Sequence, residues 1–247
     1  MQPTRQRTPV LFQATGSKRG LEFAARHAEA VFIGGRTREE IRHNITRTRE
    51  QAAINGRDPN DLKFYVMAGL IAGKTEAEAH EKLKRYRERY SVEAAHVHAQ
   101  AEIDLRHFDR SLTIGEALEQ SGRPFGNMGR RFGPDQTVGS ALDQIASFEQ
   151  GRFFVAGTPS QIADAVEDWL DIDGIDGINL RQYHTFETAR DFGELIAPEL
   201  RKRGRLPEQN SPPETLRHRL FGFDRLPTSH PARQLSLPVQ AQIASFS

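Results

Sequence analysis

Short apolar runs alternate with amphipathic segments along most of the chain. Runs typical of buried strands occupy residues 9–13, 30–34, 62–71, 153–157 and 177–180. The segments between them place apolar residues every three or four positions, which is the spacing of one face of a helix. Strands and helices that alternate in this way predict a parallel β-sheet flanked by helices, so the sequence predicts an α/β fold.

Three of the expected helices begin at motifs typical of helix caps. Thr37 and Thr75 are each followed by a glutamate three residues later, and Thr158 precedes a proline and is followed by Gln161. At this spacing the threonine hydroxyl and the Glu or Gln side chain can each bond a backbone N–H group of the first turn. We therefore expect helices to start directly after these three threonines.

Residues 91–152 break the alternation. Helices are expected within this segment at about 92–107, 114–120 and 138–148. We interpret the segment as an insertion after the third β/α unit. An insertion of this kind either shapes a substrate entrance or is a solvated excursion without a role, and the sequence leaves both readings open.

Proline, serine and arginine dominate from residue 206 onward. We therefore divide the chain into an α/β domain over residues 1–204 and an extended carboxyl-terminal arm over residues 205–247. The charges between Lys82 and Arg89 are expected to face solvent.

Composition restricts the partners that the chain can have. Lysine and arginine number 34 and aspartate and glutamate 33, and the net charge of +1 argues against a nucleic acid held by bulk charge. The sequence has no cysteine, which excludes disulfides and thiolate chemistry. Because no apolar run is long enough to span a bilayer and the amino end lacks a secretion signal, we expect a cytoplasmic protein with no membrane partner.

The turn Ala14-Thr15-Gly16-Ser17 is the first candidate for chemistry. It follows an apolar run and precedes a helical pattern that contains Leu21, so it would place small residues at a helix start. Backbone N–H groups and the positive end of a helix can hold a phosphate there, and the Ser17 hydroxyl could add a donor. The alternative is an ordinary strand–helix turn that is capped by Ser17.

Histidines near the start of the insertion are a candidate metal site. His96 and His98 lie close in sequence to Asp104 and His107. Since no second ligand cluster accompanies them at a fixed spacing, histidines on the surface of a helix explain the pattern better, and no metal is expected.

Several motifs, taken in order, resemble the flavin-dependent monooxygenases related to bacterial luciferase. They are Pro9–Ala14 with Ser17, Gly20 and 23–32, then Gly157–Asp164, Asp176–Leu180, Pro198–Gly204, and Leu220–Gly222 with Leu226–Pro227 and His230–Pro231. Within that family the motifs resemble the branch of nitrilotriacetate monooxygenase component A. Long-chain alkane and dibenzothiophene sulfone monooxygenases are relatives of that branch.

The resemblance implies a (β/α)8 TIM barrel, of which this chain has only the last four β/α units and an inserted helical segment. Strands five to eight of the barrel would end at Phe12, Ile33, Ile71 and Leu180, and the first four units have no counterpart in the sequence. Half a barrel has two unpaired strand edges and an uncovered apolar face, so we expect the chain to form a homo-oligomer.

The resemblance also implies a function. It implies reduced FMN, supplied by a separate NADH-dependent flavin reductase, and insertion of one oxygen atom from O2 into a small organic substrate. Ser17 falls on the family's phosphate-binding serine, Ala14, Thr15 and Gly16 share the cofactor turn with it, and Thr15 stands where a glycine is usual. His184 follows the last strand, at the face where barrel active sites lie, so it either contacts flavin or substrate or is a loop histidine without chemistry.

Two alternatives to this function stay open. The first is a non-catalytic half-barrel that binds a flavin phosphate or a partner subunit. The second is a deazaflavin-dependent oxidoreductase of the same superfamily. The sequence leaves the substrate open as well.

Overall fold

The computed structural model describes residues 4–35, 37–99, 103–124, 126–149, 153–208 and 214–233. The chain forms two compact units. Unit 1 consists of Met1–Met67, Asp164–Asn179 and Leu200–Ser247. Unit 2 consists of Ala68–Ala163 and Leu180–Glu199. The boundaries differ from the one expected at residue 204, because the carboxyl-terminal segment belongs to the same unit as the amino-terminal one.

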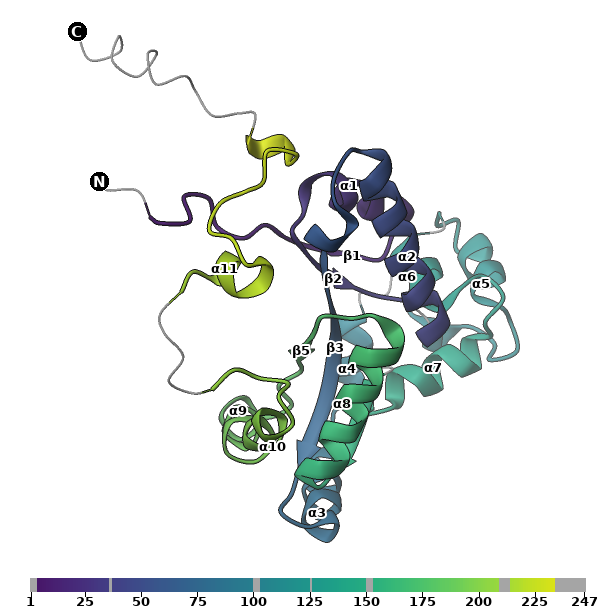
Figure 1. Cartoon of the computed structure of the whole chain (residues 1–247). Coiled ribbons are helices and arrows are strands. Elements are labelled where there is room, and N and C mark those ends of the chain that lie inside the picture. The colour runs from purple at the N-terminus through teal and green to yellow at the C-terminus, as the bar shows by residue number, and fades with distance from the viewer. Residues whose placement is uncertain are drawn as a thin grey trace, which may run out of the picture. The chain divides into compact units, whose positions relative to one another are not determined.

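In unit 1 the first three strands are parallel neighbours. Strand β1 (Phe12–Thr15) pairs with β2 (Ala30–Ile33), and β2 pairs with the first residues of β3 (Lys63–Ala72). Figure 1 shows helices α1 (Lys18–His27) and α2 (Arg38–Ile54) side by side next to β1 and β2. This confirms the expected order of parallel strands with a helix after each.

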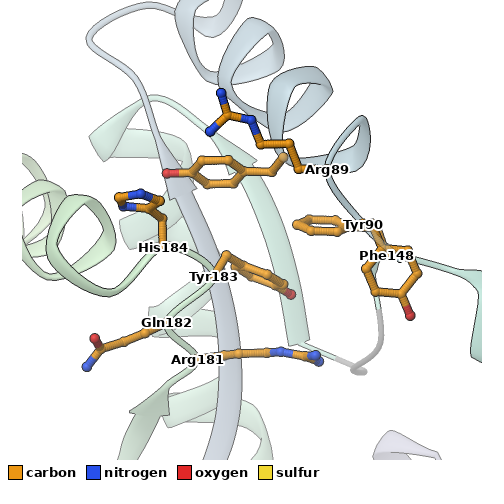
Figure 2. A pocket seen from close by; sticks show the side chains of 8 residues that line it. Arg89, Tyr90, Phe148, Arg181, Gln182, Tyr183 and His184 are labelled. Carbon is orange, nitrogen blue, oxygen red and sulfur yellow. The ribbon is translucent and has the colours of Figure 1, made fainter. Parts of the chain in front are cut away.

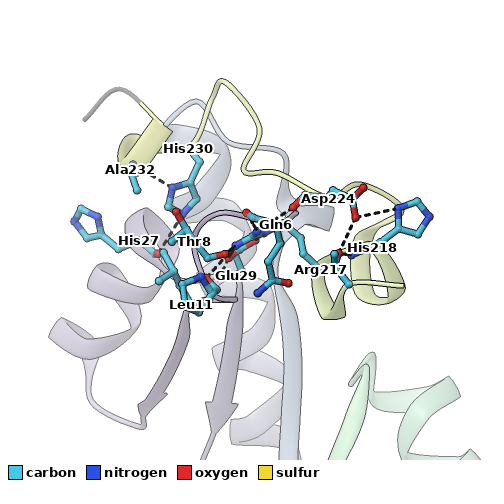
Figure 3. Close-up of polar contacts among 12 residues, drawn as sticks. Gln6, Thr8, Leu11, His27, Glu29, Arg217, His218, Asp224, His230 and Ala232 are labelled. Atoms are coloured by element: carbon cyan, nitrogen blue, oxygen red, sulfur yellow. Dashed lines mark hydrogen bonds and ion pairs between the residues drawn. The ribbon is translucent and has the colours of Figure 1, made fainter. Parts of the chain in front are cut away.

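Strand β1 begins three residues later than the apolar run predicts. Two side chains bond the backbone of residues 8–11, and the carbonyl oxygen of Leu11 also accepts from the N–H groups of Glu29 and Ala30. Glu29 accepts a hydrogen bond from the N–H group of Leu11, and Arg217 donates to the carbonyl oxygens of Thr8 and Pro9 (Figure 3). Both partners are distant in sequence, so the local apolar pattern could not place the start of the strand.

In unit 2 the second half of β3 pairs in parallel with β4 (Phe153–Gly157), from Ala68 opposite Phe153 to Ala72 opposite Gly157. Helix α3 (Glu76–Arg87) follows β3, and Thr75 caps it by accepting a hydrogen bond from the N–H group of Glu78.

The insertion folds around a core of its own. Its elements are α4 (Val92–His98), η2 (Leu105–His107), α5 (Ile114–Gln120), α6 (Asn127–Phe132) and α7 (Val138–Ala146). Residues 100–102, within the helix expected over 92–107, lie outside the described residues. Buried side chains of these elements form one apolar cluster that includes Leu105, Ile114, Phe132, Val138 and Ile145. A packed core of this kind excludes a merely solvated excursion.

The last strand, β5 (Gly177–Leu180), lies between two helical segments of the chain. Helix α8 (Pro159–Asp173) begins at the expected capping box, in which Thr158 and Gln161 bond each other's backbone N–H groups. Strand β5 pairs with β3, and the pairing order of the other strands is β1-β2-β3-β4. The following helix contains a π-helical stretch, since α9 (Thr185–Asp191), η3 (Phe192–Ile196) and α10 (Ala197–Lys202) are continuous.

In the described part of the chain, three further short helices lie in the segments that connect or follow the main helices and strands. They are η1 (Pro59–Asp61), α11 (Leu216–Phe221) and η4 (Pro231–Arg233). Helix α11 and η4 lie within the segment that was expected to be an extended arm, and Arg217 and His230 from this segment are buried in unit 1. Among the helices of the described residues, none is both long and apolar enough to cross a membrane.

Candidate functional site

The turn after β1 leads into the start of helix α1, whose first turn carries basic and no acidic side chains. Ser17 is the N-cap of α1, and its Oγ accepts a hydrogen bond from the N–H group of Gly20 at 3.2 Å. The first turn of α1 contains no acidic residue and begins with Lys18 and Arg19. The first N–H groups of a helix have no partner within the helix, so this end of α1 can hold an anion.

The backbone beside Ser17 is accessible. A Cβ atom added to Gly16 would meet no atom closer than the carbonyl oxygen of Gly34, 4.0 Å away, and one added to Gly34 would meet nothing within that distance. The N–H group of Gly34 donates to the carbonyl oxygen of Thr15 at 3.4 Å, which joins the turns after β1 and β2. The residues present therefore leave room for a phosphate to approach the start of α1.

Thr15 and Gly20 are fitted to each other. A Cβ atom on Gly20 would stand 1.8 Å from Thr15 Oγ1 and 2.9 Å from Thr15 Cβ. The threonine side chain thus lies over the first turn of α1, in space that only a glycine at position 20 leaves empty.

A second candidate site is a cavity of about 400 Å³ in unit 2 (Figure 2). Its lining comes from the carboxyl end of α3 and the turn after it, from the segment before β4, and from the loop after β5. The lining residues are Tyr86, Arg89, Tyr90, Phe148, Arg181, Gln182, Tyr183 and His184. A volume of this size is typical of small-molecule pockets.

Aromatic rings form the wall of the cavity and hold one another in place. Phe148 packs on Tyr183 with ring centroids 4.6 Å apart and meets Tyr90 edge-on at 5.7 Å. The Tyr183 hydroxyl lies over the backbone of β3, where a Cβ atom on Gly69 would stand 2.5 Å from it. Burial raises the pKa of Tyr183. These rings give a planar ligand a preformed apolar surface.

Two tyrosine hydroxyls at this site are already bonded. Tyr90 donates to the carbonyl oxygen of Ile145 at 2.7 Å, and Tyr86 donates to Glu187 at 2.6 Å. Burial and the hydrogen bond to Glu187 raise the pKa of Tyr86 far above its ordinary value, so the phenol stays neutral. The ring of Tyr86 is nearly parallel to that of His184, with centroids 6.4 Å apart.

The charged groups at the cavity are cationic. Arg89 and Arg181 line it, and among the described residues of its lining none carries a carboxylate. The guanidinium of Arg181 lies 5.1 Å from the ring centre of Tyr183. Burial lowers the pKa of Arg131, on α6, and the positive charge of Arg181 lowers it further. The region around Arg181 therefore has a positive potential.

The two candidate sites contain different sets of the residues singled out in the sequence. Ala14 and Thr15 end strand β1 and Gly16 and Ser17 form the turn after it in unit 1, whereas His184 lines the cavity in unit 2. Sequence reasoning missed the aromatic residues and both arginines of the cavity. Only Arg181, Gln182 and Tyr183 had a usable signal, because they directly follow a strand, as His184 does.

The expectation that the charges from Lys82 to Arg89 face solvent is wrong for Lys82. Its side chain is buried and its ammonium group donates to the carbonyl oxygen of Ala72 at 2.7 Å and to Asp191. The apolar stem of a lysine packs readily on a helix face, and an acidic partner from a distant helix is invisible in the local pattern.

The candidate metal ligands do not gather where the structure describes them. His107 Nε2 is 3.9 Å from Asp104, and the side chain of His98 lies outside the described part of the chain. Within the described residues no group of three or more His, Cys, Asp or Glu side chains could hold a metal ion.

The parallel strands with helices packed beside them define an α/β protein. Residues 1–177 match the family described as luciferase-like monooxygenase, and the chain belongs to that family. Long-chain alkane monooxygenase of Geobacillus thermodenitrificans is 36% identical over 235 residues, which cover 93% of this chain and 49% of that protein. Dimethyl-sulfide monooxygenase of Hyphomicrobium sulfonivorans is 33% identical, with coverage of 94% and 49%.

Solved structures agree with these relatives. The crystal structure of long-chain alkane monooxygenase superposes with a TM-score of 0.82 at 34% identity, over 96% of this chain and 51% of that one. Riboflavin lyase, solved with modified FMN and riboflavin, gives a TM-score of 0.80 at 28% identity, over 94% and 52%. The chain thus spans about half the length of the relatives that it matches.

The comparisons correct one detail of the resemblance. Nitrilotriacetate monooxygenase component A of Aminobacter aminovorans is 31% identical over 205 residues, less than the alkane and dimethyl-sulfide enzymes. The comparisons support the family and do not single out the nitrilotriacetate branch. Motifs shared by a whole family cannot separate its branches, because branch identity depends on substrate contacts outside those motifs.

Proposed function

We propose that the chain is a flavin-dependent monooxygenase, or the part of one, that binds FMN with its phosphate at the start of α1. The observation that carries the proposal is the accessible, acid-free first turn of α1, with Ser17 at its cap and Lys18 and Arg19 beside it. The family supports a flavin as the ligand, because its members act as luciferase-like monooxygenases. A separate NADH-dependent reductase would supply the flavin in its reduced form.

Each residue of the turn has a definite task in this proposal. Ser17 Oγ accepts from Gly20 and keeps its own hydrogen, which it can donate to a phosphate oxygen. The backbone N–H groups of Lys18 and Arg19 are at the helix start, and their side chains add positive charge. Bound reduced FMN supplies the electrons that activate O2. The chain holds the cofactor and keeps water from the reacting groups.

The test compares FMN with riboflavin, which lacks the phosphate. Replacing Ser17 by alanine removes one hydrogen bond to a charged group, worth about 1.5–3 kcal/mol, so FMN affinity should fall about ten- to a hundred-fold. Riboflavin affinity should stay unchanged. Titration of the protein with each flavin, followed by flavin fluorescence, measures both dissociation constants.

A matched control separates phosphate binding from helix capping. Thr37 caps α2 in the same unit and accepts from the N–H group of Glu40 at 3.1 Å, as Ser17 does in α1. Thr37→Ala should leave the ratio of FMN to riboflavin affinity unchanged. Equal weakening of both flavins by Ser17→Ala would show that Ser17 acts through folding, and no FMN binding by the parent chain would reject the proposal. FMN binding without substrate oxidation in the presence of a reductase would favour the non-catalytic alternative.

A further inference from the structure

We propose that the cavity of unit 2 binds an aromatic carboxylate, whose planar body packs on the rings and whose oxyanion is held mainly by Arg181 (Figure 2). If the proposed function holds, this ligand class is the substrate class of the enzyme, so the assignment of a substrate depends on that function. The binding itself does not depend on it, because every residue involved lies in unit 2.

The shape of the ligand follows from the rings. Phe148 and Tyr183 lie 4.6 Å apart between centroids with an angle of 30°, and Phe154 packs edge-on against both from β4. The hydroxyl groups of Tyr86 and Tyr90 are engaged elsewhere, since they donate to Glu187 and to the Ile145 carbonyl oxygen. The wall therefore favours a flat apolar body over a flexible polar one.

The charge of the ligand follows from the arginines. Arg89 and Arg181 are the charged residues among those described that line the cavity, and the positive charge of Arg181 also lowers the pKa of Arg131 on α6. Glu187, the acid on the far side of Tyr86, is occupied by the Tyr86 hydroxyl and by Arg85. A guanidinium binds a carboxylate through two parallel N–H donors, so the site favours an organic anion over a neutral or cationic molecule.

Calorimetric titration of the flavin-free chain with three probes tests the ring and the charge separately. 2-Naphthoate has both features, 2-naphthamide keeps the ring without the charge, and acetate keeps the charge without the ring. We expect 2-naphthoate to bind at least about tenfold more tightly than either of the others, since each lacks one of the two contacts.

Variants identify the residues that carry the binding. Arg181→Gln should weaken 2-naphthoate by about tenfold or more and leave 2-naphthamide unchanged, and Arg181→Lys should recover part of the loss. Arg89 is exposed, so Arg89→Gln should cost a smaller factor, about two- to fivefold. Gly69→Ala should weaken both aromatic probes, because the added methyl group displaces Tyr183.

The control is Arg190→Gln, which removes an exposed arginine of α9 in the same unit but outside the cavity. It should leave 2-naphthoate affinity unchanged. The proposal is overturned if the acid and the amide bind equally, if acetate binds as tightly as 2-naphthoate, or if Arg190→Gln weakens 2-naphthoate as much as Arg181→Gln does. Because Arg89 is exposed, Arg89→Gln still decides the charge contribution if Arg181→Gln impairs folding.

Competition distinguishes this cavity from the flavin site. FMN at saturation should not displace 2-naphthoate, whereas displacement would assign the cavity to the flavin and overturn the proposal. Failure of FMN to bind at Ser17 would reject the proposed function, but it would not change the affinity for 2-naphthoate that the titration measures. The two failures are therefore separate results.

Discussion

Thr15 and Gly20 restrict each other in the turn that we assign to the flavin phosphate. In most helices a change from glycine to alanine raises stability by about 1 kcal/mol. At position 20 the new methyl group would collide with the Thr15 side chain. We predict that Gly20→Ala lowers the free energy of unfolding in the parent chain and raises it in a Thr15→Gly background. Denaturant unfolding followed by the fluorescence of Trp169, the single tryptophan and a residue of the same unit, measures both effects.

The sign of the effect is what distinguishes this contact from a general loss of helix stability. If alanine at position 20 destabilises both backgrounds equally, the Thr15 contact is not its cause. The double-mutant cycle therefore also tests whether Thr15 and Gly20 act as a pair.

Single residues could be predicted from the sequence where their partners are local. Ser17 and Thr158 cap helices as expected, because each bonds an N–H group only three residues away. The aromatic wall of the cavity could not be predicted, because Tyr90, Phe148 and Tyr183 come from three separate segments. Their contacts depend on the path of the insertion, which no local period encodes.

The segment with α11 and η4 is joined to the amino-terminal strands by a buried polar network (Figure 3). Arg217 is fully buried and donates to both carboxylate oxygens of Glu29, at 2.7 and 3.0 Å. It also donates to backbone carbonyl oxygens on either side, including that of Gln6 at 3.0 Å. The contacts of Arg217 with Glu29 and Gln6 join residues 188 and 211 positions apart, so the composition of the segment suggested an arm where the structure has an anchor.

His230 adds a pH dependence to this anchor. Its Nδ1 accepts from the N–H group of Ala232, so Nε2 carries the proton that is donated to the carbonyl oxygen of His27. Burial lowers the pKa of His230 below its ordinary value of 6.5, and the nearby charge of Arg57 lowers it further. The unfolded chain therefore binds a proton at a higher pH than the folded chain does. The stability contribution of His230 is complete above about pH 6.5 and decreases as the pH falls below it.

We predict that His230→Gln, which keeps a donor for the His27 carbonyl oxygen but does not titrate, reduces the loss of stability between pH 7.5 and pH 5.5. Urea unfolding at both pH values, again followed by Trp169 fluorescence, compares the variant with the parent chain. His43→Gln, at an exposed position of α2, is the control and should keep the parent's pH dependence. An identical loss in parent and His230→Gln would exclude His230 as the group that titrates.

The sequence predicted more of the architecture of the chain than of its candidate sites. The apolar runs predicted the parallel sheet, and the resemblance to the family predicted that relatives would be about twice as long. The division into two units was not visible, because the boundary falls inside β3, between Met67 and Ala68. A continuous apolar strand gives no sign that its two halves belong to different packing units.

One face of the sheet in unit 1 has features that favour association between copies of this chain. Phe12, Phe32 and Tyr65 form a cluster with ring centroids 5.3 to 6.0 Å apart, and Phe12 is 43% exposed. Among the described strands, β1 pairs with β2 alone, so its other edge has unpaired backbone groups. An exposed apolar cluster next to an open strand edge favours association between chains.

We predict that the chain is a dimer or larger at micromolar concentrations and that Phe12→Lys shifts it toward the monomer, because a charge on this face opposes the burial of the rings. Phe186 is 84% exposed and belongs to unit 2, so it provides a control with the same chemical change. Phe186→Lys should leave the mass distribution of the parent unchanged. Size-exclusion chromatography with light scattering gives the masses over a range of concentrations. A parent chain that is monomeric throughout that range, or equal dissociation by both variants, would contradict the assignment of this face as the contact between copies.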